Sequence, residues 1–264
     1  MQSYRLEDIG ARLFYQDLPG GGPPLVMLHG LGSASSLVFP RVASHATLQG
    51  YRSILVDLLG FGYSERPTDY DYAMESQAKN VARLLDHLQL RNCTVVGHSM
   101  GGSIAILLAD ARPDLVGHLL VAEASLDPGP GLISSRIVCV PEEVFVSRKH
   151  AQFHEQMLAA GYCAFASTLR VADPQALYRS AVSLIAERNP SYREQFYRFT
   201  HHKTFIYGER TLPNPNEEKL RAEGISVRVV PNASHDMVID NPDGFSQTIA
   251  DAIVAAGDAR QDVV

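Results

Sequence analysis

The chain has 264 residues, of which 45% are hydrophobic and 20% are charged, and its formal net charge is −6. This is ordinary globular composition, with ample apolar residues for a core. Lysine and arginine are scattered through an acidic chain, which makes it a poor candidate for nucleic-acid binding. No apolar run approaches the roughly 18 residues that a membrane-spanning helix needs, so we expect no membrane span.

The cysteines and the N-terminal residues indicate the cellular compartment. Cys93, Cys139 and Cys163 are an odd number at wide spacings, which fits neither a disulfide framework nor a zinc site. The first residues contain no basic segment followed by an apolar stretch, so we expect no secretory signal. Reduced thiols and a cytoplasmic location are the expectation.

In chain order, strand patterns alternate with helical ones. Residues 4–8 and 12–18 predict an opening antiparallel pair of strands. Continuous apolar runs, typical of strands buried on both faces, then follow at 24–30, 51–60, 92–99, 118–125, 202–208 and 225–233. Apolar residues at intervals of three and four predict helices at 75–90, 100–113 and 241–256. Such alternation predicts an α/β fold with a mostly parallel central sheet flanked by helices.

One interval interrupts this alternation. Residues 127–200 contain helical patterns and several aromatic side chains but no convincing strand. We therefore expect a core made of residues 1–126 and 201–264. A helical cap of residues 127–200 would be inserted after the sixth strand.

The strongest chemical signal is the stretch TVVGHSMGGSIAI at 94–106. Its residues 97–101 match G-x-S-x-G, with an apolar strand before Ser99 and a helix after it. Glycines two residues on either side allow a sharp, strained turn that exposes the serine hydroxyl. The hydroxyl would lie at the carboxyl end of the sheet, where open α/β folds bind ligands.

Three further motifs complete a resemblance that extends over nearly the whole chain. They are HGLG at 29–32, D-x-x-G-x-G-x-S at 57–64 and NASH at 232–235. With the serine turn they resemble the α/β-hydrolase superfamily, in its cap-bearing, esterase-like form. The resemblance implies that Ser99 is the nucleophile and His235 its base. It also implies that the backbone N–H groups of Leu31 and Met100 form the oxyanion hole.

Other histidines compete with His235 for the role of base. His98 lies within the turn and should point away from the serine hydroxyl, and His29 belongs to the oxyanion loop. His150 and His154 are spaced for one helix face, but no third ligand is evident and we expect no metal. If the superfamily's order holds, His235 follows a strand end at the same sheet edge as Ser99.

The acid of the triad is not where many relatives have it. After the penultimate strand those relatives read G-x-x-D, whereas this chain has Thr211 at that position. In haloalkane dehalogenases the acid follows the preceding strand of the sheet, and the resemblance then points to Glu123. Glu209 is the main alternative, and Asp236 and Asp240 are more remote ones.

We therefore expect a serine hydrolase that cleaves a carboxylic ester or related acyl compound through an acyl-enzyme, without cofactor or metal. Its substrate would be a small, apolar acyl compound beneath the cap, and the protein a monomer or homodimer. Carbon–carbon bond hydrolases and cofactor-free haloperoxidases share the fold and remain alternatives. A ligand-binding protein without catalysis is an alternative of a different class.

Overall fold

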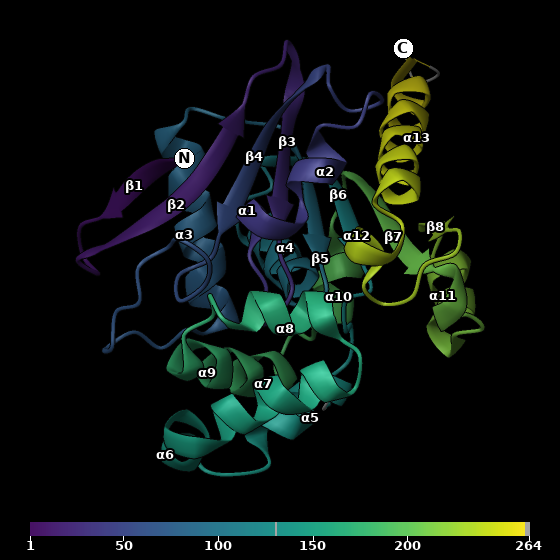
Figure 1. The fold of residues 1–264 in the computed structure, drawn as a ribbon. Coiled ribbons are helices and arrows are strands. Elements are labelled where there is room, and N and C mark those ends of the chain that lie inside the picture. The colour runs from purple at the N-terminus through teal and green to yellow at the C-terminus, as the bar shows by residue number, and fades with distance from the viewer. Residues whose placement is uncertain (130, 262–264) are drawn as a thin grey trace.

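The computed structural model describes residues 1–129 and 131–261, and within them the strands form a single sheet of eight. Its order is β1-β2-β4-β3-β5-β6-β7-β8. Only the pairs β1–β2 and β2–β4 are antiparallel, so the expected mostly parallel sheet is confirmed (Figure 1). The strands are β1 (Gln2–Leu6), β2 (Ala11–Leu18), β3 (Gly22–Leu28), β4 (Tyr51–Asp57), β5 (Cys93–His98), β6 (Val116–Ala122), β7 (His202–Gly208) and β8 (Ser226–Val230).

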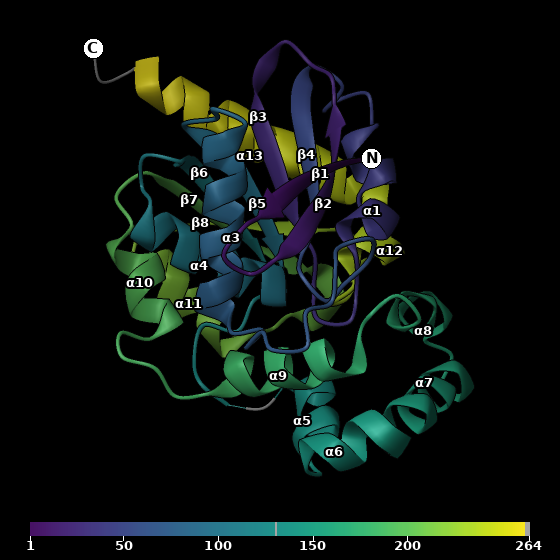
Figure 2. The same ribbon diagram turned by 90° about the vertical axis from the view of Figure 1, so that its left-hand side faces the viewer.

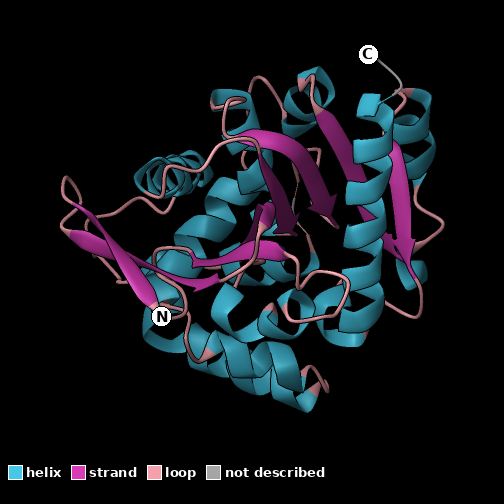
Figure 3. Cartoon of the chain, turned by 90° about the horizontal axis from the view of Figure 1, so that it is seen from above, coloured by secondary structure: helices cyan, strands magenta, loops and turns pink. Residues whose placement is uncertain are grey.

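Helices cover both faces of this sheet, as the views along and across it show (Figures 2 and 3). Leu25 and Met27 of β3 belong to the core beneath α2 (Pro40–Ala43) and α13 (Pro242–Gln261). Val26 and Leu28 belong to the core that includes α3 (Met74–His87) and α4 (Met100–Ala111). Two buried faces explain why the central strands read as continuous apolar runs. The smaller helices are α1 (Ser35–Val38), α11 (Pro215–Ala222), α12 (Met237–Asp240) and the 3₁₀ turn η2 (Glu209–Thr211).

The segment between β6 and β7 is helical. Its α8 and α9 lie next to the carboxyl ends of the central strands, with α5 to α7 farther out, and α10 packs on α4 (Figures 1 and 2). Helix α9 begins where the Asp173 carboxylate accepts hydrogen bonds from two backbone amides, with a proline as the first helical residue. The elements are α5 (Leu132–Val138), α6 (Glu142–Val144), the π-helix η1 (Phe145–Lys149), α7 (His150–Ala159), α8 (Cys163–Leu169), α9 (Pro174–Ile185) and α10 (Tyr192–Arg198).

Backbone hydrogen bonds join the α8–α9 connection to the loop after β4. The Asp173 amide donates to the Gly60 carbonyl at 2.8 Å, and the Gly62 amide donates to the Val171 carbonyl at 2.9 Å. Gly60 has φ +88°, and a Cβ there would lie only 2.2 Å from the Cβ of Ala176. This part of the helical segment is therefore held closely against the sheet's carboxyl edge. In the parts of the chain that the structure describes, no helix is both long and apolar enough to traverse a bilayer.

Candidate active site

Ser99 lies on the turn between β5 and α4, with φ 52° and ψ −118°. A side chain in the left-handed region costs about 1–2 kcal/mol, and such strain concentrates at functional sites. The flanking glycines are required by close backbone approaches. A Cβ at Gly97 would lie 2.3 Å from the Gly101 carbonyl oxygen, and one at Gly101 would lie 2.2 Å from that of Leu28. The G-x-S-x-G pattern thus holds the serine hydroxyl at the sheet's carboxyl edge, half-buried.

His235 follows β8 and reaches Ser99 from the neighbouring loop. Its Nε2 lies 3.1 Å from the Ser99 Oγ, within hydrogen-bond distance. The buried His98 lies on the other side of His235, where its Nε2 is 2.8 Å from the His235 carbonyl oxygen. Because a carbonyl only accepts, the His98 Nε2 carries the proton and donates. The hydrogen bond from His98 thus holds the backbone of His235.

Glu123 follows β6 directly and has φ 51°, a second left-handed residue beside that of Ser99. Its side chain is only 9% exposed, and its Oε2 lies 3.7 Å from the Nδ1 of His235. Its Oε1 accepts hydrogen bonds from the Gly208 amide at 2.8 Å and from the Thr211 hydroxyl at 2.5 Å. The 3.7 Å separation is an ion-pair contact, longer than a direct hydrogen bond.

The other candidate acids have different partners. The Glu209 carboxylate accepts a hydrogen bond from the Asn232 amide at 2.7 Å. The Asp240 carboxylate accepts from the amide and the hydroxyl of Ser234. Asp236 is close enough for its charge to act on His235, without a hydrogen bond between the two side chains. Of the four carboxylates considered from the sequence, Glu123 is the one in ion-pair contact with the His235 ring.

The pKa values of His235 and Glu123 move in opposite directions. Burial disfavours the charged form of His235, but the Glu123 contact and the charge of Asp236 outweigh it and raise the pKa of His235. Burial also acts to raise the pKa of Glu123. The close contact with His235 and the hydrogen bonds from Thr211 and Gly208 outweigh that effect and lower the pKa of Glu123. The carboxylate therefore stays ionised at neutral pH, ready to stabilise an imidazolium.

The two backbone amides predicted to form an oxyanion hole, those of Met100 and Leu31, belong to segments next to Ser99. Met100 is the first residue of α4, so its N–H has no intrahelical acceptor and carries the positive end of the helix dipole. Leu31 follows Gly30, where a Cβ would lie 3.3 Å from the Ser99 Cβ. The loop carrying the Leu31 amide is thus in contact with the serine turn.

His29 supports this loop. Its Nδ1 lies 2.9 Å from the Gly30 carbonyl oxygen and so carries the proton, while its Nε2 accepts from the Leu58 amide at 3.1 Å. Complete burial lowers the pKa of His29, which keeps the ring neutral. His29 therefore fixes the path of the loop and leaves no nitrogen for a substrate.

Helix α8 lies against the same loop. Gly32 has φ +73°, and a Cβ there would lie 2.8 Å from a methyl carbon of Leu169 and 3.3 Å from the ring of Phe165. The Thr168 hydroxyl donates to the Gly32 carbonyl at 2.9 Å. Apolar side chains from the helical segment thus lie close to the Leu31 amide.

A single group of side chains in the described ranges has the spacing of metal ligands. One ligand atom each from His98, His235 and Asp236 lies within 4.8 Å of the others. The His98 Nε2 is already bonded to a carbonyl, and both ring nitrogens of His235 have partners in Ser99 and Glu123. The arrangement suits proton transfer better than metal ligation. His150 and His154 do not belong to this group.

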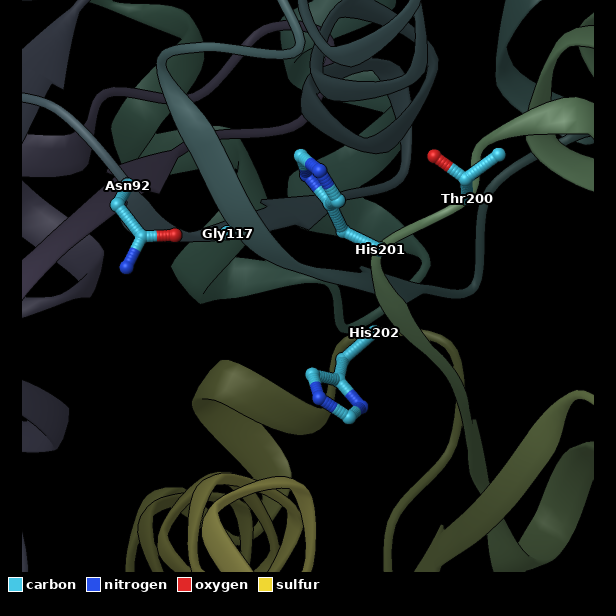
Figure 4. Close-up of a pocket in the computed structure, with 5 residues that line it drawn as sticks. All are labelled: Asn92, Gly117, Thr200, His201 and His202. Atoms are coloured by element: carbon cyan, nitrogen blue, oxygen red, sulfur yellow. The ribbon is translucent and has the colours of Figure 1, made fainter. Parts of the chain in front are cut away.

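Two surface cavities lie away from Ser99. One, of about 320 Å³, lies at the amino ends of β5 to β7, at the edge opposite the serine. Figure 4 shows the side chains of His201 and His202 pointing to opposite sides of β7 there. The other, of about 590 Å³, lies between α3, α4 and residues 188–198. Neither contains any of the residues that the sequence predicts to be catalytic.

Comparison with known proteins agrees with the observed fold. A family described as the alpha/beta hydrolase fold matches residues 23–137, which contain the oxyanion loop, the serine turn and β6 with Glu123. The chain has the α/β-hydrolase fold. A similar protein is 2-hydroxymuconate semialdehyde hydrolase of Pseudomonas sp. (strain CF600), 38% identical over 39% of this chain and 36% of that protein.

Two other proteins extend the comparison. Haloalkane dehalogenase 2 of Mycobacterium tuberculosis is 29% identical over 57% of this chain and 52% of the dehalogenase. A carboxylesterase structure from Nitrososphaera gargenis superposes with a TM-score of 0.82 over 98% of this chain and 100% of that one, at 18% identity. The matches to the two curated relatives thus span between about a third and a half of those relatives' length, and the structural likeness concerns the fold.

Two contacts at this site are not predictable from the sequence patterns. From the sequence, Thr211 indicates only that no acid stands at this position. In the structure, its hydroxyl is hydrogen-bonded to the Glu123 carboxylate. The second contact is the hydrogen bond from the His98 ring to the His235 carbonyl, which joins residues 137 positions apart. The one available signal for the first contact was that Thr211 and Glu123 both follow neighbouring strands of a parallel sheet.

Proposed function

We propose that the chain is a serine hydrolase that cleaves a carboxylic ester or related acyl compound through an acyl-enzyme. The observation that carries the proposal is the 3.1 Å contact between the Ser99 Oγ and the His235 Nε2, with the Glu123 carboxylate 3.7 Å from the opposite ring nitrogen. Nucleophile, base and orienting acid in that order are what acyl transfer by serine requires.

The reaction then follows from the positions of the protons. The Ser99 Oγ attacks the substrate carbonyl as its proton passes to the His235 Nε2, and the Leu31 and Met100 amides donate to the oxyanion. His235 returns the proton to the leaving alcohol, which departs as the acyl-enzyme forms. Water attacks the acyl carbon as its proton passes to His235. The bond to the Ser99 Oγ then breaks, His235 returns the proton to that oxygen, and the carboxylic acid leaves. Each proton and charge is handled by these residues, so the chemistry calls for no metal or organic cofactor.

The substrate is proposed to be a small, apolar acyl compound. Residues 127–200 would act as a cap over a core of residues 1–126 and 201–264. Support comes from α8, whose Leu169 and Phe165 side chains lie against the oxyanion loop at Gly32. An acyl chain bound beside that loop would meet apolar surface. We extend the proposal to a cytoplasmic monomer or homodimer, consistent with free thiols at Cys93, Cys139 and Cys163.

A second candidate is hydrolysis of a carbon–carbon bond in a ring-cleavage product by the same residues. It is favoured by the 38% identity to 2-hydroxymuconate semialdehyde hydrolase over the matched segment. The serine at position 99 argues against haloalkane dehalogenase and epoxide hydrolase activity, since relatives with those activities use aspartate as the nucleophile.

Two measurements test the proposed function together. A fluorophosphonate probe should label the wild-type protein stoichiometrically, because the probe requires an activated serine. A panel of p-nitrophenyl esters of rising acyl length should then reveal turnover with a preferred length. Labelling without ester turnover, but with cleavage of a ring-cleavage diketone, would favour the second candidate. Absence of labelling would favour a binding protein and contradict both.

The pH dependence of the reaction follows from the raised pKa of His235. The base must be neutral in the free enzyme, so kcat/KM should be low in acid and rise as the pH passes through the His235 pKa. Since that pKa lies above its ordinary value of about 6.5, the half-maximal pH should also lie above 6.5. A profile of kcat/KM between pH 5 and 9 measures this, and a midpoint below 6.5 would contradict it.

A further inference from the structure

The two oxygens of the Glu123 carboxylate have separate partners. The Oε2 faces the His235 Nδ1, while the Oε1 accepts from the Gly208 amide and the Thr211 hydroxyl. The Oε1 contacts come from the end of β7 and the η2 turn, next to the strand that carries Glu123. One oxygen is thus held by the protein and the other is left to the histidine.

The Thr211 hydroxyl has one proton and two possible acceptors. Its oxygen lies 2.5 Å from the Glu123 Oε1 and 2.8 Å from the Gly208 carbonyl oxygen. A charged acceptor forms the shorter and stronger hydrogen bond, so the proton points to Glu123. Donation to the carboxylate also offsets the cost of burying it.

We propose that Thr211 is a positioning residue that orients the Glu123 carboxylate toward His235. The inference rests on the proposed function and deepens it. A glutamate reaching across from β6 has one more rotatable bond than an aspartate, so its carboxylate needs a second support to stay in one orientation. Thr211, at the position where many relatives carry the acid, supplies that support.

The consequence of losing the hydroxyl follows from geometry. With valine at position 211, which has nearly the same shape, only the Gly208 amide would hold the Oε1. The carboxylate could then turn about its last bond and withdraw the Oε2 from the His235 Nδ1, a contact already 3.7 Å long. His235 would lose orientation and charge stabilisation in the transition state, while substrate binding would be unaffected.

The experiment compares Thr211→Val with Thr211→Ser, which keeps the hydroxyl. The hydrogen bond from Thr211 to the charged Glu123 carboxylate would help to stabilise the His235 imidazolium in the transition state. Without it, kcat on the best p-nitrophenyl ester should fall by about tenfold in Thr211→Val. KM should change by less than about twofold, since ground-state binding is not involved. The rate of fluorophosphonate labelling should fall in parallel. Thr211→Ser should recover most of the lost rate.

A matched control and a double mutant sharpen the test. Thr248→Val removes a threonine hydroxyl that donates to the Gly244 carbonyl within α13, a helix that carries none of the residues predicted to be catalytic, and should leave kcat unchanged. In a Glu123→Gln background, Thr211→Val should have almost no further effect, because its action passes through the carboxylate. Melting temperatures identify any variant that is merely unfolded, and Thr211→Ala would then replace the valine variant.

Each outcome supports or overturns the proposal. An unchanged kcat in folded Thr211→Val overturns it, as does a Thr211→Ser variant no better than valine. A full additional loss in the Glu123→Gln background would mean that Thr211 acts elsewhere. If the wild-type protein is not labelled at all, the proposed function itself fails and this inference falls with it. If the wild-type protein is labelled but Thr211→Val has an unchanged kcat, this inference is wrong and the proposed function is unaffected.

Discussion

Ser99→Ala is expected to abolish turnover and fluorophosphonate labelling, with a loss in kcat on the order of 10⁶. The Ser99 Oγ is the one atom that would form a bond to the substrate, and the 3.1 Å contact with the His235 Nε2 is what would activate it. Alanine fits the same strained turn, so the fold should persist. Steady-state kinetics on the best ester and intact-protein mass spectrometry after labelling measure the two effects.

The matched control lies one turn farther along α4. Ser103 is completely buried and its Oγ has no hydrogen-bond partner among the described residues. Ser103→Ala therefore removes a hydroxyl from the same helix without removing a contact, and both activity and labelling should be retained. Undiminished turnover in Ser99→Ala, with the protein free of contaminating esterase, would exclude the proposed mechanism.

Glu123→Gln is expected to lower kcat by about 10⁴ while leaving the protein folded, as loss of the orienting acid does in other triads. Glutamine keeps the shape and can still accept from Gly208 and Thr211, but it has no charge to stabilise the His235 imidazolium. Because that charge and contact raise the pKa of His235, the midpoint of the kcat/KM profile should also move to lower pH. Kinetics across pH 5–9 measure both effects.

Glu209→Gln provides the comparison for the second prediction. The Glu209 carboxylate accepts a hydrogen bond from the Asn232 amide, at the start of the loop that carries His235. Since Glu209 does not contact the His235 ring in the described hydrogen bonds, Glu209→Gln should lower the rate at most a few-fold. A large loss in Glu209→Gln together with an active Glu123→Gln would reverse the assignment of the acid. Comparing the rates of Glu123→Gln and Glu209→Gln therefore tests which carboxylate acts as the acid.

The register of the sheet explains why Ser99 and Glu123 meet. In the parallel pair β5–β6, His98 lies opposite Ala122, and the Ser99 amide donates to the Ala122 carbonyl at 2.8 Å. The next residue on each strand, Ser99 and Glu123, then adopts a positive φ and leaves the sheet at the same edge. The left-handed backbone of Glu123 has no signature in its sequence, because glutamate rarely adopts it.

The sequence by itself determined the fold class and the position of the serine turn. Continuous apolar runs separated by amphipathic helices define a parallel sheet, and glycines two residues on either side of Ser99 are needed wherever the backbone nearly touches itself. These are local properties, dictated by side-chain volume and backbone freedom, and they can be interpreted without coordinates.

Only the tertiary structure decided which carboxylate lies beside His235 and which groups Thr211 contacts. Glu123, Thr211 and His235 come from the ends of three different strands and are separated by 24 to 112 positions in the chain. Whether such side chains touch depends on strand register, on a left-handed residue and on loop paths to within about 1 Å. No spacing in the sequence encodes those distances.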